Sequence, residues 1–140
     1  MNGIVIDASV ALAWCFPDEA SKYADSVLLA LENETVIVPA IWAVEVANAL
    51  LVGERRKRIR PSEVRRFVDL VKGLNIVEDG QAFAETVSNV LPLAREHMLS
   101  AYDAAYLDVA VRHEIPLATL DDALQKACAL AGINIFRMRI

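Results

Sequence analysis

The chain has 140 residues, and 56% of them are hydrophobic, which fits one folded domain with a buried core. This composition excludes an intrinsically disordered chain. The formal net charge of −5, from 14 basic and 19 acidic residues, argues against broad affinity for nucleic acid. We therefore expect a single domain over residues 1–140.

Membrane association is not expected, because the charge-poor stretch 35–53 is interrupted by Pro39 and Glu45. The first basic residue is Lys22, so no signal-peptide n-region precedes the apolar start. Cys15 and Cys128 lie in apolar helical patterns without metal-site spacing, and we expect buried, reduced thiols. These features predict a cytoplasmic protein.

Apolar spacing along the chain alternates between short strand-like runs and helical patterns. The predicted strands are residues 3–6, 35–38, 74–77, 117–119 and 134–136. The predicted helices are residues 9–15, 18–31, 40–52, 61–72, 81–91, 92–97, 101–113 and 122–131. Gly53 is expected to end the helix 40–52, and Pro92 to kink or break the helical segment around it. The alternation predicts an α/β fold in three layers, with helices on both faces of a five-stranded parallel sheet.

Two acidic residues directly follow predicted strands. Asp7 comes after the first strand and Asp121 after the fourth, and ligands of open α/β sheets bind beyond the carboxyl ends of the strands. Either residue could instead serve as a helix N-cap. Ser9, two residues after Asp7, could hold its carboxylate or a metal-bound water.

Two further acids lie near the starts of predicted helices. Glu45 has mainly apolar helical neighbours and no lysine or arginine at helical spacing, so its charge needs a cation or a distant salt bridge. Asp103 follows Ser100 in a capping-box pattern, which offers it a purely structural role. Its helical neighbours nevertheless place Asp103 on an inward face.

The four acids could converge, because strand ends and the following helix starts share one edge of a parallel sheet. Clustered carboxylates raise one another's pKa, and a divalent cation removes that repulsion. Oxygen-only ligands select Mg²⁺ or Mn²⁺. Such a site suits phosphodiester hydrolysis by a metal-activated water.

Half of the basic residues fall in one short segment between positions 55 and 66. This basic segment comprises Arg55, Arg56, Lys57, Arg58, Arg60, Arg65 and Arg66. It could guide an RNA backbone, chiefly through Arg55, Arg56 and Arg58, or contact a protein partner. A solvated helix end and turn is the alternative.

The chain resembles the PIN-domain family, and in particular VapC-type toxins of toxin–antitoxin pairs. The matching segments are 4–9 (IVIDAS), 39–50 (PAIWAVEVANAL), 100–107 (SAYDAAYL) and 116–121 (PLATLD). The resemblance implies a five-stranded parallel sheet, a Mg²⁺- or Mn²⁺-dependent endoribonuclease and a dimer neutralised by a VapB-type antitoxin.

The same resemblance implies roles for individual residues. The family's metal-binding acids match Asp7, Glu45, Asp103 and Asp121. Its supporting polar positions match Ser9, Asn48 and Thr119, while Asp122 could substitute for Asp121 or assist it.

Two other classes of function compete with this interpretation. A non-catalytic PIN-like binding module would keep the fold and lose metal ligands. A receiver or haloacid-dehalogenase-type phosphatase domain would also place an acid after the first strand. The receiver usually has adjacent acids there and the phosphatase an Asp-x-Asp, whereas this chain has a lone Asp7 followed by Ser9.

Overall fold

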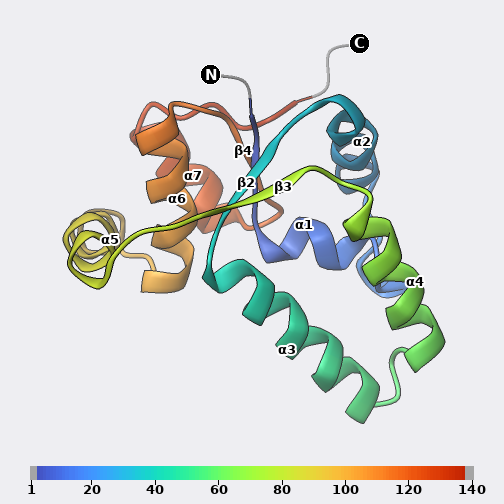
Figure 1. Cartoon of the computed structure of the whole chain (residues 1–140). Coiled ribbons are helices and arrows are strands. Elements are labelled where there is room, and N and C mark those ends of the chain that lie inside the picture. Colours follow the sequence, from blue (N-terminus) through green and yellow to red (C-terminus); the bar gives the residue numbers. More distant parts are fainter. Residues whose placement is uncertain (1–2, 138–140) are drawn as a thin grey trace.

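The computed structural model describes residues 3–137 (Figure 1). Its strands are β1 (Val5–Ile6), β2 (Val36–Pro39), β3 (Ile76–Asp79) and β4 (Leu117–Ala118). Its α-helices are α1 (Ala8–Ala13), α2 (Lys22–Ala30), α3 (Ile41–Arg55), α4 (Pro61–Lys72), α5 (Phe83–His97), α6 (Ala101–His113) and α7 (Asp122–Leu130). Two 3₁₀ helices, η1 (Pro17–Glu19) and η2 (Leu31–Asn33), flank α2, so the predicted helix 18–31 is divided.

The strands are parallel and follow the order β3-β2-β1-β4. β1 pairs with β4 and β2 pairs with β3. A parallel bridge between Ile4 and Val36 joins the two pairs, and the Ile37 amide donates to the Ile4 carbonyl at 3.0 Å. Beyond β4 there is one bridge, from Leu117 to Ile135. The parallel α/β class is confirmed, but within residues 3–137 the predicted fifth strand is reduced to this single bridge.

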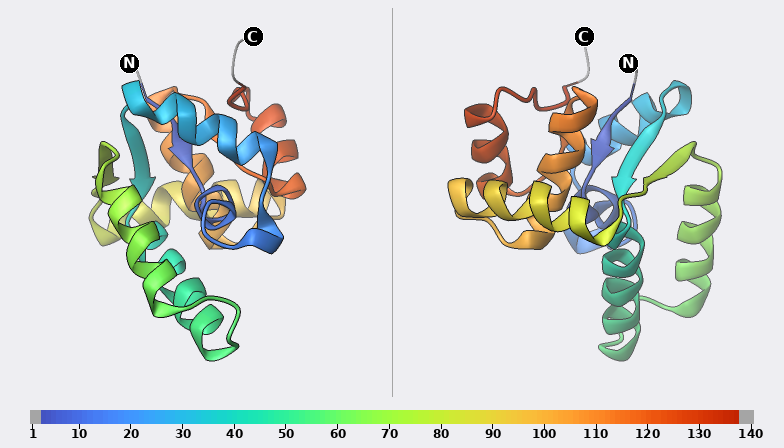
Figure 2. Two further views of the ribbon diagram at one scale, coloured as in Figure 1. Left: turned by 90° about the vertical axis from the view of Figure 1, so that its right-hand side faces the viewer. Right: turned by 60° about the vertical axis from the view of Figure 1, so that its left-hand side comes forward.

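Helices cover the strands on both sides (Figures 1 and 2). Helices α5, α6 and α7 lie on one side, and α1, α2 and α4 lie on the other. The strands β1, β2 and β4 are apolar on both faces, and Val5, Ile6 and Leu117 are fully buried between the helix layers, whereas the edge strand β3 is partly exposed. This arrangement agrees with the predicted three layers.

Gly53 does not end its helix as predicted; α3 continues through it to Arg55. A Cβ atom at this position would stand 2.6 Å from ring carbons of buried Phe16. The glycine therefore allows close approach of α3 to the segment after α1 rather than a turn. Lys57, with φ of 58°, adopts the left-handed conformation in the connection that follows.

Pro92 does not break its helix either, because α5 runs continuously from Phe83 to His97. The carbonyl that loses its intrahelical donor belongs to Ser88. Ser88 and Pro92 are both exposed, so water can replace the missing hydrogen bond. The predicted strand 74–77 is displaced to Ile76–Asp79, whereas the predicted helices 61–72 and 101–113 match α4 and α6.

The carboxyl edge of the strands is the structural origin of the candidate site. Helices α1 and α3 begin directly after β1 and β2, and α7 begins after β4. The first turn of α6 lies at the same edge, below the strands in Figure 1. Among residues 3–137, every helix is too short or too polar to cross a membrane.

Candidate active site

Asp7 is the most deeply buried of the predicted acids, with 5% of its surface exposed. It is the N-cap of α1, and its Oδ1 accepts hydrogen bonds from the Val10 amide at 3.2 Å and the Ser9 hydroxyl at 2.6 Å. Burial raises the pKa of Asp7, against the opposing effect of these hydrogen bonds. Asp7 therefore serves as the N-cap of α1, which is one of the roles that its place in the sequence allows. Burial at the same time disfavours the charged form of its carboxylate.

Thr119 and Ser9 join Asp7 to the loop after β4. The hydroxyl of fully buried Thr119 donates to Oδ2 of Asp7 and accepts the Asp121 amide at 3.0 Å. The Ser9 hydroxyl accepts the Leu120 amide at 3.0 Å. Both oxygens of Asp7 are thus fixed in direction by residues that the sequence analysis selected as supporting positions.

Asp103 lies in the first turn of α6 and is half-buried. Ser100 caps the helix by accepting the Asp103 amide at 3.1 Å. Burial raises the pKa of Asp103, and the charge of Asp121 raises it further. The charge of Asp103 in turn contributes to the raised pKa of Asp7. These three carboxylates therefore lie within electrostatic reach of one another.

Asp121 occupies the N-cap position of α7, but its side chain makes no capping hydrogen bond. Asp121 is half-buried, whereas its neighbour Asp122 is exposed. The N-cap alternative for the Asp121 carboxylate is therefore not realised, and its charge acts instead on Asp103.

Glu45 is half-buried near the start of α3, beside rather than on the buried stripe formed by Trp42, Val46 and Leu50. Glu45 therefore lies at the edge of the apolar face on which its helical neighbours were expected to place it. Within residues 3–137 Glu45 has no salt bridge; instead the Tyr106 hydroxyl of α6 donates to its Oε1. Asn48, the predicted companion of Glu45, is exposed.

Tyr106 is the residue of this region that sequence reasoning missed. It was visible only as an apolar-face neighbour of Asp103, one turn away on the same helix. Burial raises the pKa of Tyr106, and the hydrogen bond to Glu45 and the charges of Glu45, Asp7 and Asp103 raise it further. Its hydroxyl therefore contacts Glu45 directly and feels the charges of Asp7 and Asp103.

The donor set fits a hard divalent cation in type and charge. It consists of carboxylate oxygens, and the charges that raise the pKa of Asp7 and Asp103 are those of other carboxylates. No three histidine, cysteine, aspartate or glutamate side chains among residues 3–137 already stand together as a ligand set. A cation would therefore have to draw the carboxylates closer.

The basic segment runs from the far end of α3 through the connection to α4 and into α4 itself, which contains Arg65 and Arg66. Arg55 and Arg56 are exposed. Exposure is expected both for residues that contact RNA or a protein partner and for a solvated helix end. Arg58 instead pairs with Asp18 and Glu19 at 2.9 Å each and stacks over Phe16. This pairing ties the connection to η1.

A separate polar cluster occupies the other end of α6. Arg112 pairs with Asp108 at 2.9 Å and with Asp79 at 2.5 Å, and His113 reaches Asp79 at 2.7 Å. Burial raises the pKa of Asp79, but Arg112 and His113 outweigh it and leave that pKa below its ordinary value. Asp108, five residues after Asp103 on α6, belongs to this cluster and not to the candidate site. The cluster fixes β3 to α6.

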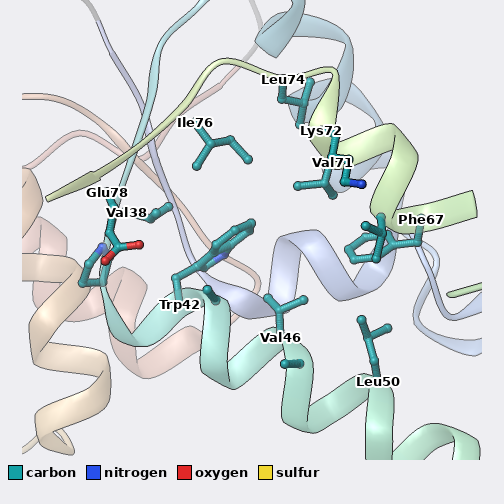
Figure 3. A pocket seen from close by; sticks show the side chains of 14 residues that line it. Val38, Trp42, Val46, Leu50, Phe67, Val71, Lys72, Leu74, Ile76 and Glu78 are labelled. Carbon is teal, nitrogen blue, oxygen red and sulfur yellow. The ribbon is translucent and has the colours of Figure 1, made fainter. Parts of the chain in front are cut away.

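An apolar groove of about 490 Å³ lies between α3 and α4 (Figure 3). Its floor includes Trp42, Val46, Leu50, Phe67 and Val71. The indole N–H of Trp42 is buried without a hydrogen-bond partner in the described part of the chain. The groove is distinct from the acidic residues.

Comparison with known proteins agrees with this geometry. The family model for the PIN domain matches residues 4–130. Ribonuclease VapC3 of Pyrobaculum aerophilum is 32% identical over 126 residues, which cover 86% of this chain and 91% of that protein.

Solved structures share the fold. The crystal structure of PAE2754 from Pyrobaculum aerophilum matches with a TM-score of 0.67 and 24% identity, covering 89% of this chain and 78% of that one. The crystal structure of FitAcB from Neisseria gonorrhoeae matches with a TM-score of 0.59 and 16% identity, covering 96% of both chains.

The parallel α/β fold with acids at its carboxyl edge thus defines the class. This chain belongs to the PIN domain family. The similarity to Ribonuclease VapC3 supports the more specific resemblance to VapC-type proteins. The receiver and phosphatase alternatives are set aside by this match.

Proposed function

We propose that this chain is a Mg²⁺- or Mn²⁺-dependent endoribonuclease and the toxin of a VapBC-type pair. The observation that carries the proposal is the placement of three acids from separate parts of the chain: Asp7 follows β1, Asp121 follows β4, and Asp103 lies in the first turn of α6. In agreement with this placement, the charge of Asp103 raises the pKa of Asp7, and the charge of Asp121 raises that of Asp103. Within residues 3–137 no basic side chain forms a salt bridge with them. The relative named Ribonuclease VapC3 supports RNA as the substrate.

The proposed ligands of the cation are Asp7, Glu45, Asp103 and Asp121. A bound divalent cation would supply an activated water and charge neutralisation for phosphodiester hydrolysis. The chain itself contributes fixed carboxylate directions: Ser9 and Thr119 hold Asp7 by hydrogen bonds. In this proposal the four carboxylates form a complete ligand set only when the cation binds.

Arg55 and Arg56 are proposed to guide the RNA backbone. Glu45 precedes Arg55 by about ten residues of one helix, so roughly 15 Å along the axis separates the acids from the basic segment. A single strand lying along α3 would span that interval with a few nucleotides. Arg58 is a weaker candidate because its guanidinium is already paired.

A VapB-type antitoxin is the proposed protein partner, in a cytoplasmic setting, and the toxin is proposed to act as a homodimer. The groove between α3 and α4 suits an apolar antitoxin segment, because aliphatic and aromatic side chains of both helices line it. Ala43 lines this groove, so Ala43→Arg should weaken the antitoxin complex in a pull-down while leaving Mn²⁺ binding unchanged. Unchanged capture of antitoxin would reject this docking surface.

Cleavage of a mixed structured RNA pool by antitoxin-free protein tests the nuclease proposal. We expect discrete cuts in Mn²⁺ or Mg²⁺, and none with a chelator or with Asp103→Asn. Equal cutting by both proteins would indicate a contaminating nuclease. Absence of cutting together with absence of Mn²⁺ binding would favour the non-catalytic PIN-like module, which the lack of a preformed ligand set also allows.

A further inference from the structure

Glu45 needs an orienting partner that its own helix does not supply. Ile41 and Ala49, one turn away on α3, carry no hydrogen-bonding side chain, and within residues 3–137 the exposed amide of Asn48 makes no hydrogen bond to Glu45. A glutamate has three side-chain torsions, and a carboxylate without a partner samples several rotamers. The one side-chain hydrogen bond recorded for Glu45 within residues 3–137 comes from Tyr106.

Tyr106 is well placed to fix that carboxylate. It lies on α6 one turn after Asp103 and is 1% exposed. The surrounding core therefore determines where its hydroxyl stands. Tyr106 and Glu45 are 61 residues apart in the chain, so their hydrogen bond connects α6 to α3 across the site.

We infer that Tyr106 is a positioning residue of the acidic site: its hydroxyl holds Oε1 of Glu45 and leaves Oε2 as the ligand oxygen for the divalent cation. The inference rests on the proposed function, because it assumes that Glu45 is a metal ligand. Outer partners of metal-ligating carboxylates fix ligand direction in this way. Tyr106 itself acts as a donor only.

The electrostatic surroundings agree with a donor role. Burial, followed by the hydrogen bond to Glu45 and the charges of the acids, keeps the pKa of Tyr106 above its ordinary value.

Calorimetric titration with Mn²⁺ tests the inference in a double-mutant cycle. We expect Tyr106→Phe to weaken Mn²⁺ binding by about 10- to 100-fold, as loss of an outer partner does. Tyr102→Phe is the matched control, because Tyr102 lies on the same helix and is 61% exposed. In a Glu45→Ala background the Tyr106 substitution should add less than about a twofold change, since no carboxylate remains to be positioned.

Three results would overturn the inference and can be told apart. If Glu45→Ala weakens Mn²⁺ binding and Tyr106→Phe does not, the positioning role fails while the proposed metal site stands. An equal loss from Tyr106→Phe with and without Glu45 also removes the positioning role. If Glu45→Ala leaves Mn²⁺ binding intact, Glu45 is not a ligand and that part of the proposed function fails as well.

A second measurement keeps the inference testable if Tyr106→Phe does not fold. In wild-type protein, NMR should show a slowly exchanging Tyr106 hydroxyl proton both without and with Mg²⁺, and Glu45→Ala should abolish its protection. Loss of the protected proton on adding Mg²⁺ would mean that the bond breaks when the metal arrives, and would refute the inference.

Discussion

Replacing Thr119 with valine removes one hydroxyl from a position with 0% exposure, so water cannot take its place. That hydroxyl donates to the buried carboxylate of Asp7 and accepts the Asp121 amide. A hydrogen bond to a charged group is worth about 1.5–3 kcal/mol, and a stranded buried donor costs a similar amount. We expect Thr119→Val to lower the free energy of unfolding by about 3 kcal/mol at neutral pH.

The loss of stability from Thr119→Val should depend on pH, and the pKa of Asp7 determines in which direction. The Thr119 hydroxyl lowers the pKa of Asp7, which burial has raised above the ordinary value of 3.8. In the variant the folded-state pKa rises further. An acid whose pKa is higher in the folded than in the unfolded protein lowers the free energy of unfolding as pH rises. This decrease begins near the ordinary pKa of 3.8 and is complete above the pKa in the folded protein. The loss should therefore be smaller near the ordinary pKa of aspartate than at neutral pH.

Urea denaturation at the two pH values measures both effects. Thr86→Val is the matched control, since the exposed Thr86 hydroxyl bonds only the Ala82 carbonyl, at 3.1 Å, and its loss should cost less than about 0.5 kcal/mol. A loss at Thr119 of less than about 1 kcal/mol, or one that is equal at both pH values, would refute the reasoning.

Three further outcomes follow from the packing and the charges. Gly53→Ala should destabilise the fold by about 1–3 kcal/mol in urea denaturation, because the new Cβ meets the Phe16 ring at 2.6 Å; unchanged stability would show that the ring moves freely. Arg112→Met should cost about 3 kcal/mol at neutral pH, because Asp108 loses its ionic partner and Asp79 keeps only His113, and this loss should shrink as pH falls below 3.8 through the lowered pKa of Asp79. Joint replacement of Arg55 and Arg56 by alanine in a cleavage-deficient background should reduce the slope of log affinity for single-stranded RNA against log salt by about 1.4, and an unchanged slope in fluorescence anisotropy would exclude RNA contact.

The acids after the strands could be predicted from the sequence because their position depends on local order along the chain. Asp7 and Asp121 each follow a short apolar strand, and parallel strands bring such positions to one edge. The hydrogen bonds from Ser9 to Asp7 and from the Asp121 amide to Thr119 span two residues and need little tertiary information. Those from Thr119 to Asp7 and from the Leu120 amide to Ser9 depend on the pairing of β1 with β4. The metal-binding role of the acids stays a prediction.

Contacts between distant segments were beyond the sequence pattern. The partner of Glu45 is a tyrosine 61 residues away, where charge arguments pointed to a cation. Arg58 pairs with Asp18 at a separation of 40 residues, so an apparently exposed cation is already engaged. Gly53 looked like a helix end because its contact with Phe16 exists only in the fold.

The chemistry of the RNA ends tests the central claim most directly. Purified protein should be incubated with a short labelled RNA containing a mapped cut, with Mg²⁺ and separately with a chelator. Attack by an activated water predicts Mg²⁺-dependent fragments with 5′-phosphate and 3′-hydroxyl ends, absent from the Asp103→Asn reaction. Fragments with 2′,3′-cyclic phosphate ends, or cutting that persists in the chelator, would contradict hydrolysis at this acidic site.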